Sequence, residues 1–368
     1  MNNYAVIMAG GVGTRFWPKG TTKLPKQFLK IADEHNSLIQ QAYKRLEGVF
    51  HDSKIFVVTN VNYKSEVKKQ LPKIPDGNII CEPIGRNTAP CIGLACLFIN
   101  QFDSKANVLV VAADHLINDN DEFHRVIKCG LKFVSDNGGI VTLGIHPTKP
   151  ETGYGYIQYD AEKVVDIEIE KNGGNIYEKV YKVKTFAEKP NSEVAKAFLE
   201  SGDFLWNSGM FIFRTDTMTE EIKNFMPELH ISLEKLREHL LSNDFAKILE
   251  EEYSKLKSIS IDYGVMEKAK DVFIIRSHFG WNDVGAWDEV YNIKEKDSHG
   301  NVNQGRTVTI NTKNCLIIND QKIVATIGVE DLLIINTENG LLICKRDEAQ
   351  SVKEVVDYLR RKGMDQYL

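Results

Sequence analysis

The chain has 368 residues, 42% of them hydrophobic and 26% charged, with a formal net charge of −5 at pH 7. This is ordinary for a globular protein with one large domain and a smaller one, and the negative charge argues against non-specific nucleic-acid binding. No apolar run approaches the roughly 18 residues of a membrane span, and no signal peptide precedes the first apolar run. We therefore predict a cytoplasmic protein with no nucleic-acid and no membrane partner. Its six cysteines include no C-x-x-C pair, which predicts buried free thiols rather than a zinc site.

A glycine-rich stretch follows the first apolar run, residues 4–8, which is predicted to be a strand. It reads AGGVGTRFWP over residues 9–18 and is followed by KLPKQ over residues 23–27. Glycines let the backbone turn sharply and present N–H groups to an anion. Arg15 and Lys26 add positive charge, so the stretch is predicted to cradle a triphosphate. A plain tight turn is the alternative.

Two better-known glycine loops do not fit this stretch. A P-loop ends in Gly-Lys-Ser/Thr, whereas Gly13 is followed by Thr14 and Arg15. A dinucleotide-binding turn needs a third glycine where Phe16 stands, which disfavours a nicotinamide-dependent dehydrogenase.

Apolar strands alternate with helical patterns up to residue 144. This rhythm predicts a mainly parallel sheet with helices on both faces. Ser37 and Gln40 have the spacing of a capping box at the start of the first helix. The expected strands are residues 4–8, 55–59, 79–81, 107–113 and 140–144, and the expected helices are residues 37–50, 62–71, 88–98 and 121–137.

A polar turn at residues 82–90 follows the third strand, at the strand end where open α/β sheets bind ligands. Glu82 can accept hydrogen bonds from the N–H groups on the pairing edge of guanine. The structural alternative is that Thr88 caps the next helix and that Arg86 forms a surface ion pair.

Two aspartates are candidate metal ligands. Asp114 follows the nearly all-apolar run 107–113, where an acid is unfavourable unless it is paired or bound to a cation; a helix cap is its alternative role. Asp283 lies in a Gly- and Trp-rich loop after the apolar run 272–276. Two carboxylates from different strands can clamp one Mg²⁺ against phosphates. His115 is expected to be a hydrogen-bonded structural residue.

Polar residues of the middle segment can meet a sugar phosphate. Residues 150–157 hold two close glycines with aromatic neighbours, which lets backbone approach a polar ligand, although a hairpin turn has the same pattern. Glu188 can accept from sugar hydroxyls and Lys189 can meet a phosphate, unless they are an exposed pair before a helix. Asn207 offers an amide beside the aromatic Trp206.

The remaining segments are expected to be scaffold. Residues 164–183 are predicted to form a hairpin around the turn 171–174, and Asp262 is predicted to cap a helix. After residue 293, short apolar runs separated by Asn, Asp and Gly predict stacked β coils or a meander. Poorly shielded coil edges predict packing on the main domain or on a second copy. Residues 348–362 are predicted to be a closing helix.

Together the motifs resemble those of the mannose-1-phosphate guanylyltransferases, a group of sugar nucleotidyltransferases, over most of the chain. The matching motifs, in the order of the family, are AGGVGTRFWP with PKQFL, GRNTAP, TGYGYI, EKP, WNSGMF, SIDY and WNDVG. The resemblance implies a Rossmann-like (GT-A-like) α/β nucleotidyltransferase domain, with a mixed sheet and helices on both faces, in residues 1–292. A small left-handed β-helix-like segment with a terminal helix is implied for residues 293–368.

The resemblance also implies an activity and a site. The chain would transfer GMP from GTP to α-D-mannose 1-phosphate, with Mg²⁺ as cofactor. A homodimer through the C-terminal segment is expected separately, from the poorly shielded coil edges. The implied GTP-binding residues are Gly10, Gly11, Gly13, Thr14, Arg15, Lys26, Glu82, Asn87 and Thr88. The implied sugar-phosphate residues are Tyr154, Gly155, Glu188, Lys189 and Asn207. The implied metal ligands are Asp114 and Asp283, and the implied catalytic residues are Arg15, Lys26 and Asp114.

Departures from the family pattern are small. The family usually has proline at Ala112, serine at Asn282 and Ala286, and alanine at Gly264. None of these removes a charged group, so they bear on sugar preference rather than on the reaction. Guanylyl transfer to a manno-heptose or glucose 1-phosphate, and a non-catalytic sugar-nucleotide-binding subunit, are the alternative functions. A fused isomerase domain, present in some relatives, is not expected in a chain of this length.

Overall fold

The computed structural model describes residues 2–11, 13–171 and 174–368. The chain forms two compact units. The first unit comprises Met1–Gly10, Ala42–Ala113 and Ile117–Trp281, and the second comprises Gly11–Gln41, Asp114–Leu116 and Asn282–Leu368. The glycine-rich loop from Gly11 onward therefore belongs to the same unit as the C-terminal segment. The domain boundary at residue 292 stays a prediction.

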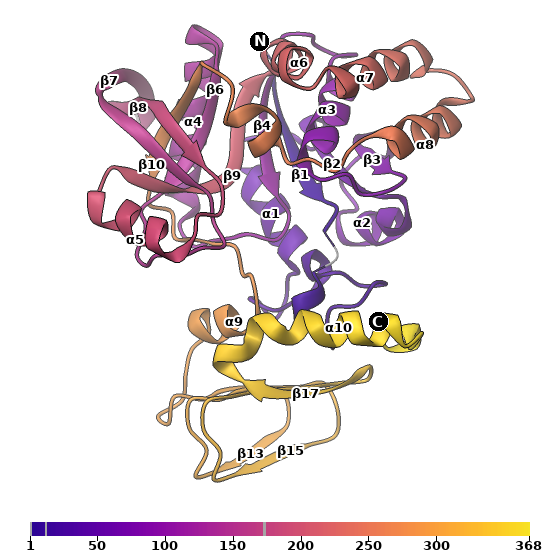
Figure 1. Cartoon of the computed structure of the whole chain (residues 1–368), viewed down its shortest axis with the longest axis vertical. Helices are drawn as coiled ribbons and strands as arrows, with labels where there is room; N and C mark the ends of the chain where they lie inside the picture. The colour runs from indigo at the N-terminus through magenta and orange to yellow at the C-terminus, as the bar shows by residue number, and fades with distance from the viewer. Residues whose placement is uncertain (1, 12, 172–173) are drawn as a thin grey trace. The chain divides into compact units, whose positions relative to one another are not determined.

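The first unit is built on a nine-stranded mixed sheet in the order β3-β2-β1-β4-β9-β6-β10-β8-β7 (Figure 1). Strand β1 is parallel to β2 and β4, while β9 is antiparallel to β4, β6 and β7. The mixed sheet that the resemblance implied is confirmed. The mainly parallel sheet predicted from the strand–helix rhythm is wrong for the sheet as a whole, because β7, β8 and β9 pair antiparallel with their neighbours. The strands are β1 (Asn3–Ala9), β2 (Ile55–Asn60), β3 (Ile79–Glu82), β4 (Asn107–Ala112), β6 (Ile140–Ile145), β7 (Tyr156–Lys171), β8 (Gly174–Ala187), β9 (Phe204–Arg214) and β10 (Val272–Ser277).

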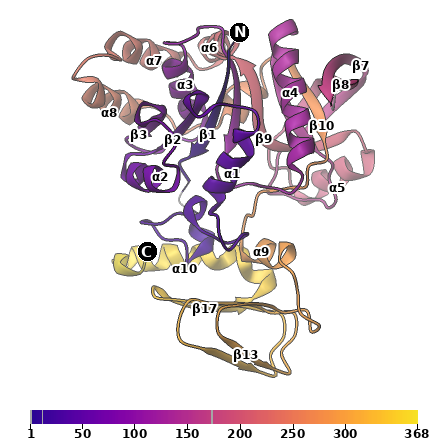
Figure 2. The same ribbon diagram turned by 180° about the vertical axis from the view of Figure 1, so that it is seen from behind.

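Helices cover both faces of this sheet (Figures 1 and 2). Because side chains alternate along a strand, Phe211 and Phe213 of β9 join the core under α3 and α6, while Ile212 reaches Gly130 of α4. The helices are α1 (Leu38–Glu47), α2 (Lys64–Gln70), α3 (Thr88–Ile99), α4 (Asn120–Asn137), α5 (Ser192–Ser201), α6 (Thr215–Phe225), α7 (Pro227–His239) and α8 (Phe245–Lys255). Short strands β5 (Leu116–Ile117) and β11 (Trp281–Asn282) lie where the chain passes between units.

Local predictions in this part of the chain are largely confirmed. The capping box is present, since Ser37 N donates to Gln40 Oε1 and Gln40 N donates to Ser37 Oγ. The predicted hairpin is the β7–β8 pair, and its turn residues 172–173 lie outside the described residues. One prediction is wrong: Asp262 opens a π-helical turn, Asp262–Met266, but its side chain makes no cap.

The second unit contains stacked β coils, as expected, rather than a meander. Strands β12 (Val302–Gln304), β14 (Leu316–Asn319) and β16 (Leu332–Thr337) are parallel neighbours, and β13 (Thr307–Ile310) is parallel to β15 (Val324–Ile327). The antiparallel strand β17 (Gly340–Lys345) completes the larger sheet. The terminal helix α10 spans Val352–Arg361 after a 3-10 turn at Arg346–Ser351.

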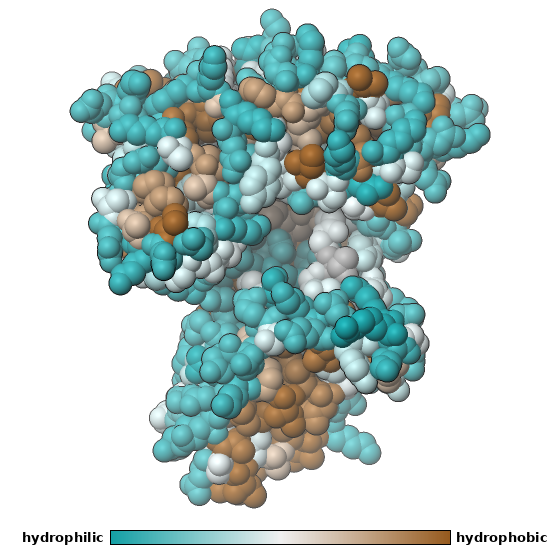
Figure 3. Space-filling view, viewed as in Figure 1, coloured by the Kyte–Doolittle hydropathy of each residue, from teal (hydrophilic) through white to brown (hydrophobic). Residues whose placement is uncertain are grey.

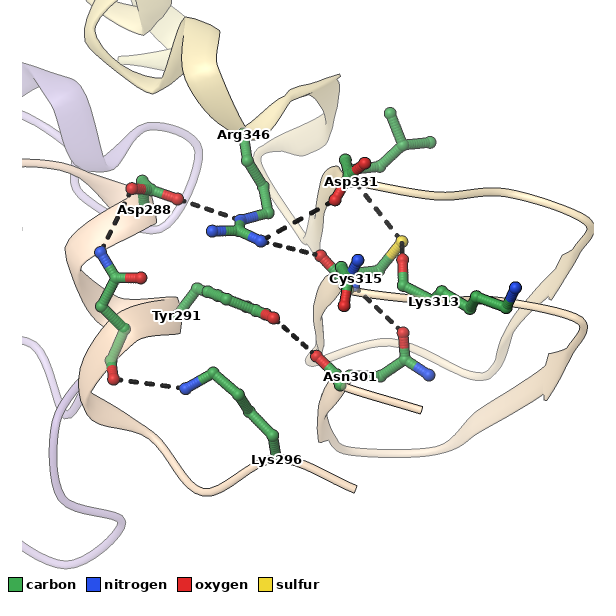
Figure 4. A network of polar contacts seen from close by, with 12 residues as sticks. Asp288, Tyr291, Lys296, Asn301, Lys313, Cys315, Asp331 and Arg346 are labelled. Atoms are coloured by element: carbon green, nitrogen blue, oxygen red, sulfur yellow. Dashed lines mark hydrogen bonds and ion pairs between the residues drawn. The ribbon is translucent and has the colours of Figure 1, made fainter. Parts of the chain in front are cut away.

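A polar network fastens helix α9 (Trp287–Ile293) to these coils (Figure 4). Arg346 Nε donates to Asp288 Oδ1 at 3.0 Å, and the guanidinium lies 3.6 Å from the centre of the Tyr291 ring. The Tyr291 hydroxyl donates to Gly300 O at 2.8 Å. Stacking on Tyr291 and ion pairing with Asp288 together hold Arg346 against helix α9.

The six cysteines are free thiols, four of them buried and Cys81 and Cys344 half-buried, so the prediction of free thiols is confirmed. Among the described residues, no helix combines the length and the apolar character that a membrane crossing requires.

Candidate active site

The glycine-rich loop of the second unit is shaped around one lysine. Gly13 has a φ of 63°, in the left-handed region that favours glycine. A Cβ there would collide with the Cβ of Lys26 and lie 3.0 Å from its backbone nitrogen. Gln27, which is buried, donates from Nε2 to Gly11 O at 3.0 Å. The loop therefore needs glycine at residue 13 because the chain passes directly over residue 26.

Lys26 connects the two aspartates predicted from the sequence. Its ammonium donates to Asp114 Oδ2 at 2.8 Å and to the backbone oxygen of Asp283 at 2.6 Å. The lysine side chain is 8% exposed, and the Asp114 side chain is 36% exposed. The structure thus brings these three residues together, although 88 and 257 positions separate the lysine from its partners.

The charge on Asp114 is stabilised by its surroundings. Burial by itself would raise the pKa of this carboxyl, but the Lys26 ammonium, with His115 beside it, outweighs burial and lowers the pKa. The group is therefore a carboxylate at neutral pH. Arg15, in contrast, is exposed, and among the described residues no hydrogen bond or ion pair to it is formed. Thr14 is half-exposed in the 3-10 turn Thr14–Phe16.

The Asp114 carboxylate and the backbone oxygen of Asp283 both reach the Lys26 ammonium, and oxygen ligands suit hard cations such as Mg²⁺. Among the described residues, no group of three or more His, Cys, Asp or Glu side chains is placed to hold a metal ion. The Asp283 carboxylate lies over Gly285, where an added Cβ would be 3.2 Å from Oδ2. Val284 has a φ of 46°, which is unusual for a β-branched residue and marks a constrained loop.

The end of the same loop is held by distant parts of the second unit. The Trp17 indole donates to Tyr367 O at 2.8 Å, and Pro18 O accepts from Thr337 Oγ1 and from Asn339 Nδ2. The Trp287 indole donates to Trp17 O at 3.1 Å. None of these contacts was predicted, because no local pattern signals them.

In the first unit, Glu82 ends β3 as a buried carboxyl, 3% exposed. Its Oε1 has no hydrogen-bond partner among the described residues, and its Oε2 would lie 3.4 Å from a Cβ added to Gly10. Burial raises the pKa of Glu82 to about 7, although Tyr253 partly opposes the rise. A buried acceptor without a donor is unfavourable, so this group is suited to a ligand that brings N–H donors.

The turn after Glu82 is pinned at the start of helix α3. Asn87 has a φ of 68°, and its side chain accepts from Thr88 N at 2.8 Å. The Thr88 hydroxyl accepts from Ile261 N at 2.8 Å. Arg86 donates to the backbone oxygens of Tyr253 and Ser254 rather than forming an ion pair. The structural alternatives for Thr88 and Arg86 are thus replaced by contacts with residues far along the chain.

The residues expected at the sugar converge in the first unit. A Cβ on Gly155 would collide with the Glu188 carboxylate and lie 3.2 Å from Asn207 Cβ. The ring of Tyr154 stands edge-on to those of Trp206 and Trp281, each 5.1 Å away between ring centres. Asn207 N donates to Gly155 O, and Lys189 N donates to Tyr154 O.

Lys189 and Asn207 are each held by several contacts. Lys189 has a φ of 48°, and its ammonium pairs with Glu188 at 2.9 Å. Asn207 lies inside β9. Its Oδ1 accepts from Thr142 Oγ1 and Gly209 N, and its Nδ2 donates to Asp262 Oδ1 at 2.8 Å.

An open cavity of about 670 Å³ joins the two groups of first-unit residues. Its wall includes Asn87 and Thr88, which are expected to border the base, Glu188 and Lys189, which are expected at the sugar phosphate, and Asp262. A cavity of this size suits a drug-sized or nucleotide-sized ligand. Asp262 was not predicted as a site residue because a helix cap explained its position.

Comparison with known proteins gives the family. Residues 4–300 match the nucleotidyl transferase family, and residues 305–359 match the β-helix domain described as MannoseP isomerase/GMP-like. Relatives named mannose-1-phosphate guanylyltransferase from Klebsiella pneumoniae and Escherichia coli are 38% and 39% identical. Each match covers 98% of this chain and 75% or 76% of the relative.

Solved structures agree with this assignment. A crystal structure from Thermus thermophilus, named mannose-1-phosphate geranyltransferase, superposes with a TM-score of 0.84 at 31% identity. The match covers 98% of this chain and the whole of the other. A structure from Helicobacter pylori, named mannose-6-phosphate isomerase, matches 77% of this chain and all of its own, with a TM-score of 0.61 and 25% identity. This chain belongs to the nucleotidyl transferase family, within the group of the mannose-1-phosphate guanylyltransferases.

Proposed function

We propose that this chain transfers GMP from GTP to α-D-mannose 1-phosphate, releasing pyrophosphate and forming GDP-mannose. The observation that carries the proposal is the similarity, over 98% of the chain, to relatives named for this reaction. The paired Lys26 and Asp114 support an active enzyme over a non-catalytic subunit, since a subunit that only binds has no need of an ionised carboxylate at this position.

In the proposed reaction an oxygen of the sugar 1-phosphate attacks the α-phosphorus of GTP. The bond to the bridging oxygen of the β-phosphate breaks, and pyrophosphate leaves with that oxygen. The attacking phosphate is an anion at neutral pH, so no histidine or other general base is needed. Catalysis rests on alignment and on stabilising negative charge, with no covalent intermediate.

The site residues take their roles from chemistry and position. Gly11, Gly13 and Thr14 would offer backbone N–H groups to the triphosphate. The exposed Arg15 would form an ion pair with the triphosphate, and Lys26 would supply a second positive charge. Gly10, Glu82, Asn87 and Thr88 would border guanine, with the unpaired Glu82 oxygen accepting from the base. Tyr154, Gly155, Glu188 and Asn207 would line the hexose, and Lys189 would meet its phosphate.

Nucleotidyl transferases generally use a divalent metal ion. We propose Mg²⁺ here, held by Asp114 and Asp283. When bound, it would neutralise phosphate charge and help to align the attacking group. Lys26 would then exchange one of its present partners for a phosphate oxygen.

We also propose a homodimer through the C-terminal segment. Six aliphatic side chains are exposed on and beside β13, β15 and β17, and Figure 3 shows brown, hydrophobic surface over this segment. They are Val308, Ile310, Ile323, Ile327, Leu341 and Ile343. Exposed apolar surface of this kind commonly marks an interface. A cytoplasmic location stays a prediction.

The experiment that tests the function is a matrix of four nucleoside triphosphates against several sugar 1-phosphates. Pyrophosphate release is measured with Mg²⁺ and after chelation with EDTA. We expect the largest kcat/KM for GTP with mannose 1-phosphate, and loss of activity on chelation. A larger kcat/KM for a manno-heptose 1-phosphate would show that this sugar, not mannose 1-phosphate, is the substrate. If no pair releases pyrophosphate, the proposed enzymatic function is refuted.

A further inference from the structure

Asp262 stands where the two sides of the first-unit cavity meet. Its Oδ1 accepts from Asn207 Nδ2 at 2.8 Å on the sugar side. The preceding residue, Ile261, donates its N–H to the Thr88 hydroxyl at 2.8 Å on the base side. The half-buried Asp262 is thus held through its carboxylate on one side and through the backbone of the preceding residue on the other, and it lines the cavity.

The second oxygen of Asp262 accepts no hydrogen bond from another described residue. The nearby ammonium of Lys189 is paired with Glu188 at 2.9 Å. Burial, followed by the negative charge of Glu188, raises the pKa of Asp262 to about 6. A carboxylate oxygen in this condition gains more from a ligand donor than one that is already satisfied.

Asp203 shows what a purely structural aspartate looks like in the same unit. It also accepts from a side-chain amide, Gln158 Nε2, at 2.6 Å, through Oδ2. Its other oxygen accepts from Ser201 Oγ at 2.7 Å. The hydrogen bond from Gln158 is the largest of several that lower the pKa of Asp203. Each of its oxygens therefore already accepts a hydrogen bond from another residue, unlike Oδ2 of Asp262.

We propose that Asp262 recognises the sugar: Oδ1 holds the Asn207 amide in place, and Oδ2 accepts a hydrogen bond from one hexose hydroxyl of the sugar 1-phosphate. This assignment rests on the proposed function. It makes Asp262 a specificity residue, because a sugar without a hydroxyl at that position leaves Oδ2 without a ligand donor.

The test compares three variants of the full chain by pyrophosphate release. Asp262→Asn keeps an oxygen acceptor for Asn207 but places an N–H₂ donor at the other position, and Asp262→Ala removes both. Asp203→Asn is the matched control. We expect the KM for mannose 1-phosphate to rise about 10- to 100-fold in Asp262→Asn, the range for a hydrogen bond to a charged group. The KM for GTP should change less than about 2-fold, and Asp203→Asn should leave both KM values unchanged.

Deoxy sugars separate direct contact from a structural effect. The 2-, 3-, 4- and 6-deoxy forms of mannose 1-phosphate are assayed with wild type and with both Asp262 variants. One analogue should lose kcat/KM about 10- to 100-fold with wild type and much less with the variants, since the same contact cannot be lost twice. Losses that multiply for all four analogues would overturn the proposal.

The wild-type protein provides a second check that does not depend on the folding of any variant. If wild type uses all four deoxy analogues within about 2-fold of mannose 1-phosphate, no hydroxyl is read and the proposal fails while the proposed function stands. If wild type releases no pyrophosphate with any sugar 1-phosphate, the proposed function fails and this assignment fails with it.

Discussion

The candidate site acids of the two units are held in opposite ways. In the second unit, Asp114 contacts an ammonium and has a lowered pKa. In the first unit, burial raises the pKa of Glu82 to about 7 and that of Asp262 to about 6. A carboxylate that is paired with an ammonium keeps its charge and can stabilise other charges. A carboxyl group with an oxygen that no other residue satisfies can instead accept a hydrogen bond from a neutral donor of a ligand. The difference separates the residues suited to electrostatic catalysis from those suited to reading a base and a sugar.

The largest expected effect comes from removing the paired charge. Asp114→Asn should lower kcat by at least about 100-fold, the usual scale for losing a key electrostatic group. The measurement is pyrophosphate release from GTP and mannose 1-phosphate at saturating Mg²⁺.

The matched control is Asp320→Asn. Asp320 also pairs with a lysine of the second unit, Lys19 at 3.0 Å, but this pair is more exposed, so kcat should change less than about 2-fold. Near-normal turnover in Asp114→Asn would refute the metal and catalytic assignment together.

A smaller effect is expected when a buried, under-paired carboxyl is neutralised. The pKa of Glu82 is higher in the folded protein, about 7, than its ordinary 4.5, so ionising it weakens folding as the pH rises from about 4.5 to 7. Glu82→Gln should raise the free energy of unfolding at pH 8 by about 2 kcal/mol and change it little at pH 4.5. The expected gain is smaller than the energy that corresponds to the whole pKa shift, at about 1.4 kcal/mol per pKa unit, because the glutamine side chain is still a buried polar group. Urea unfolding at both pH values measures the effect.

Glu252→Gln should do the reverse. Ser232, Lys235 and Lys255 donate to the Glu252 carboxylate. Burial alone would raise its pKa, but these partners lower it to about 2. The stabilisation is therefore present above the ordinary pKa and is lost as the pH falls through the folded value. At pH 8 the free energy of unfolding of Glu252→Gln should be about 1–2 kcal/mol lower than that of wild type. A higher value would contradict the stabilising role assigned to the paired Glu252 carboxylate.

The smallest effect concerns the anchoring of the glycine-rich loop. Trp17→Phe keeps an aromatic ring but removes the indole N–H that donates to Tyr367 O. The free energy of unfolding should fall by about 1 kcal/mol, the typical value of one hydrogen bond. Trp206→Phe is the control, because the Trp206 indole nitrogen has no partner among the described residues. If the free energy of unfolding falls equally in both variants, the hydrogen bond from Trp17 to Tyr367 O contributes nothing specific to stability.

Local chemistry was readable from the sequence, and distant partners were not. The Ser37–Gln40 capping box depends on two residues three positions apart, and the structure has it. The contact between Lys26 and Asp283 spans 257 positions, and no periodic pattern encodes it. Asp262 was misread for the same reason, since its position predicts a cap and its real partner, Asn207, is 55 positions away.

The contacts of Trp17 and Pro18 have a consequence for how the protein is made. A ribosome completes the glycine-rich loop early, yet its partners Thr337, Asn339 and Tyr367 lie 319 to 350 positions later. The loop therefore reaches its final surroundings only after nearly all of the chain has been synthesised. A truncated nascent chain can build the strands of the first unit while the loop is still unanchored, so assembly of this part of the site is a late event in biosynthesis.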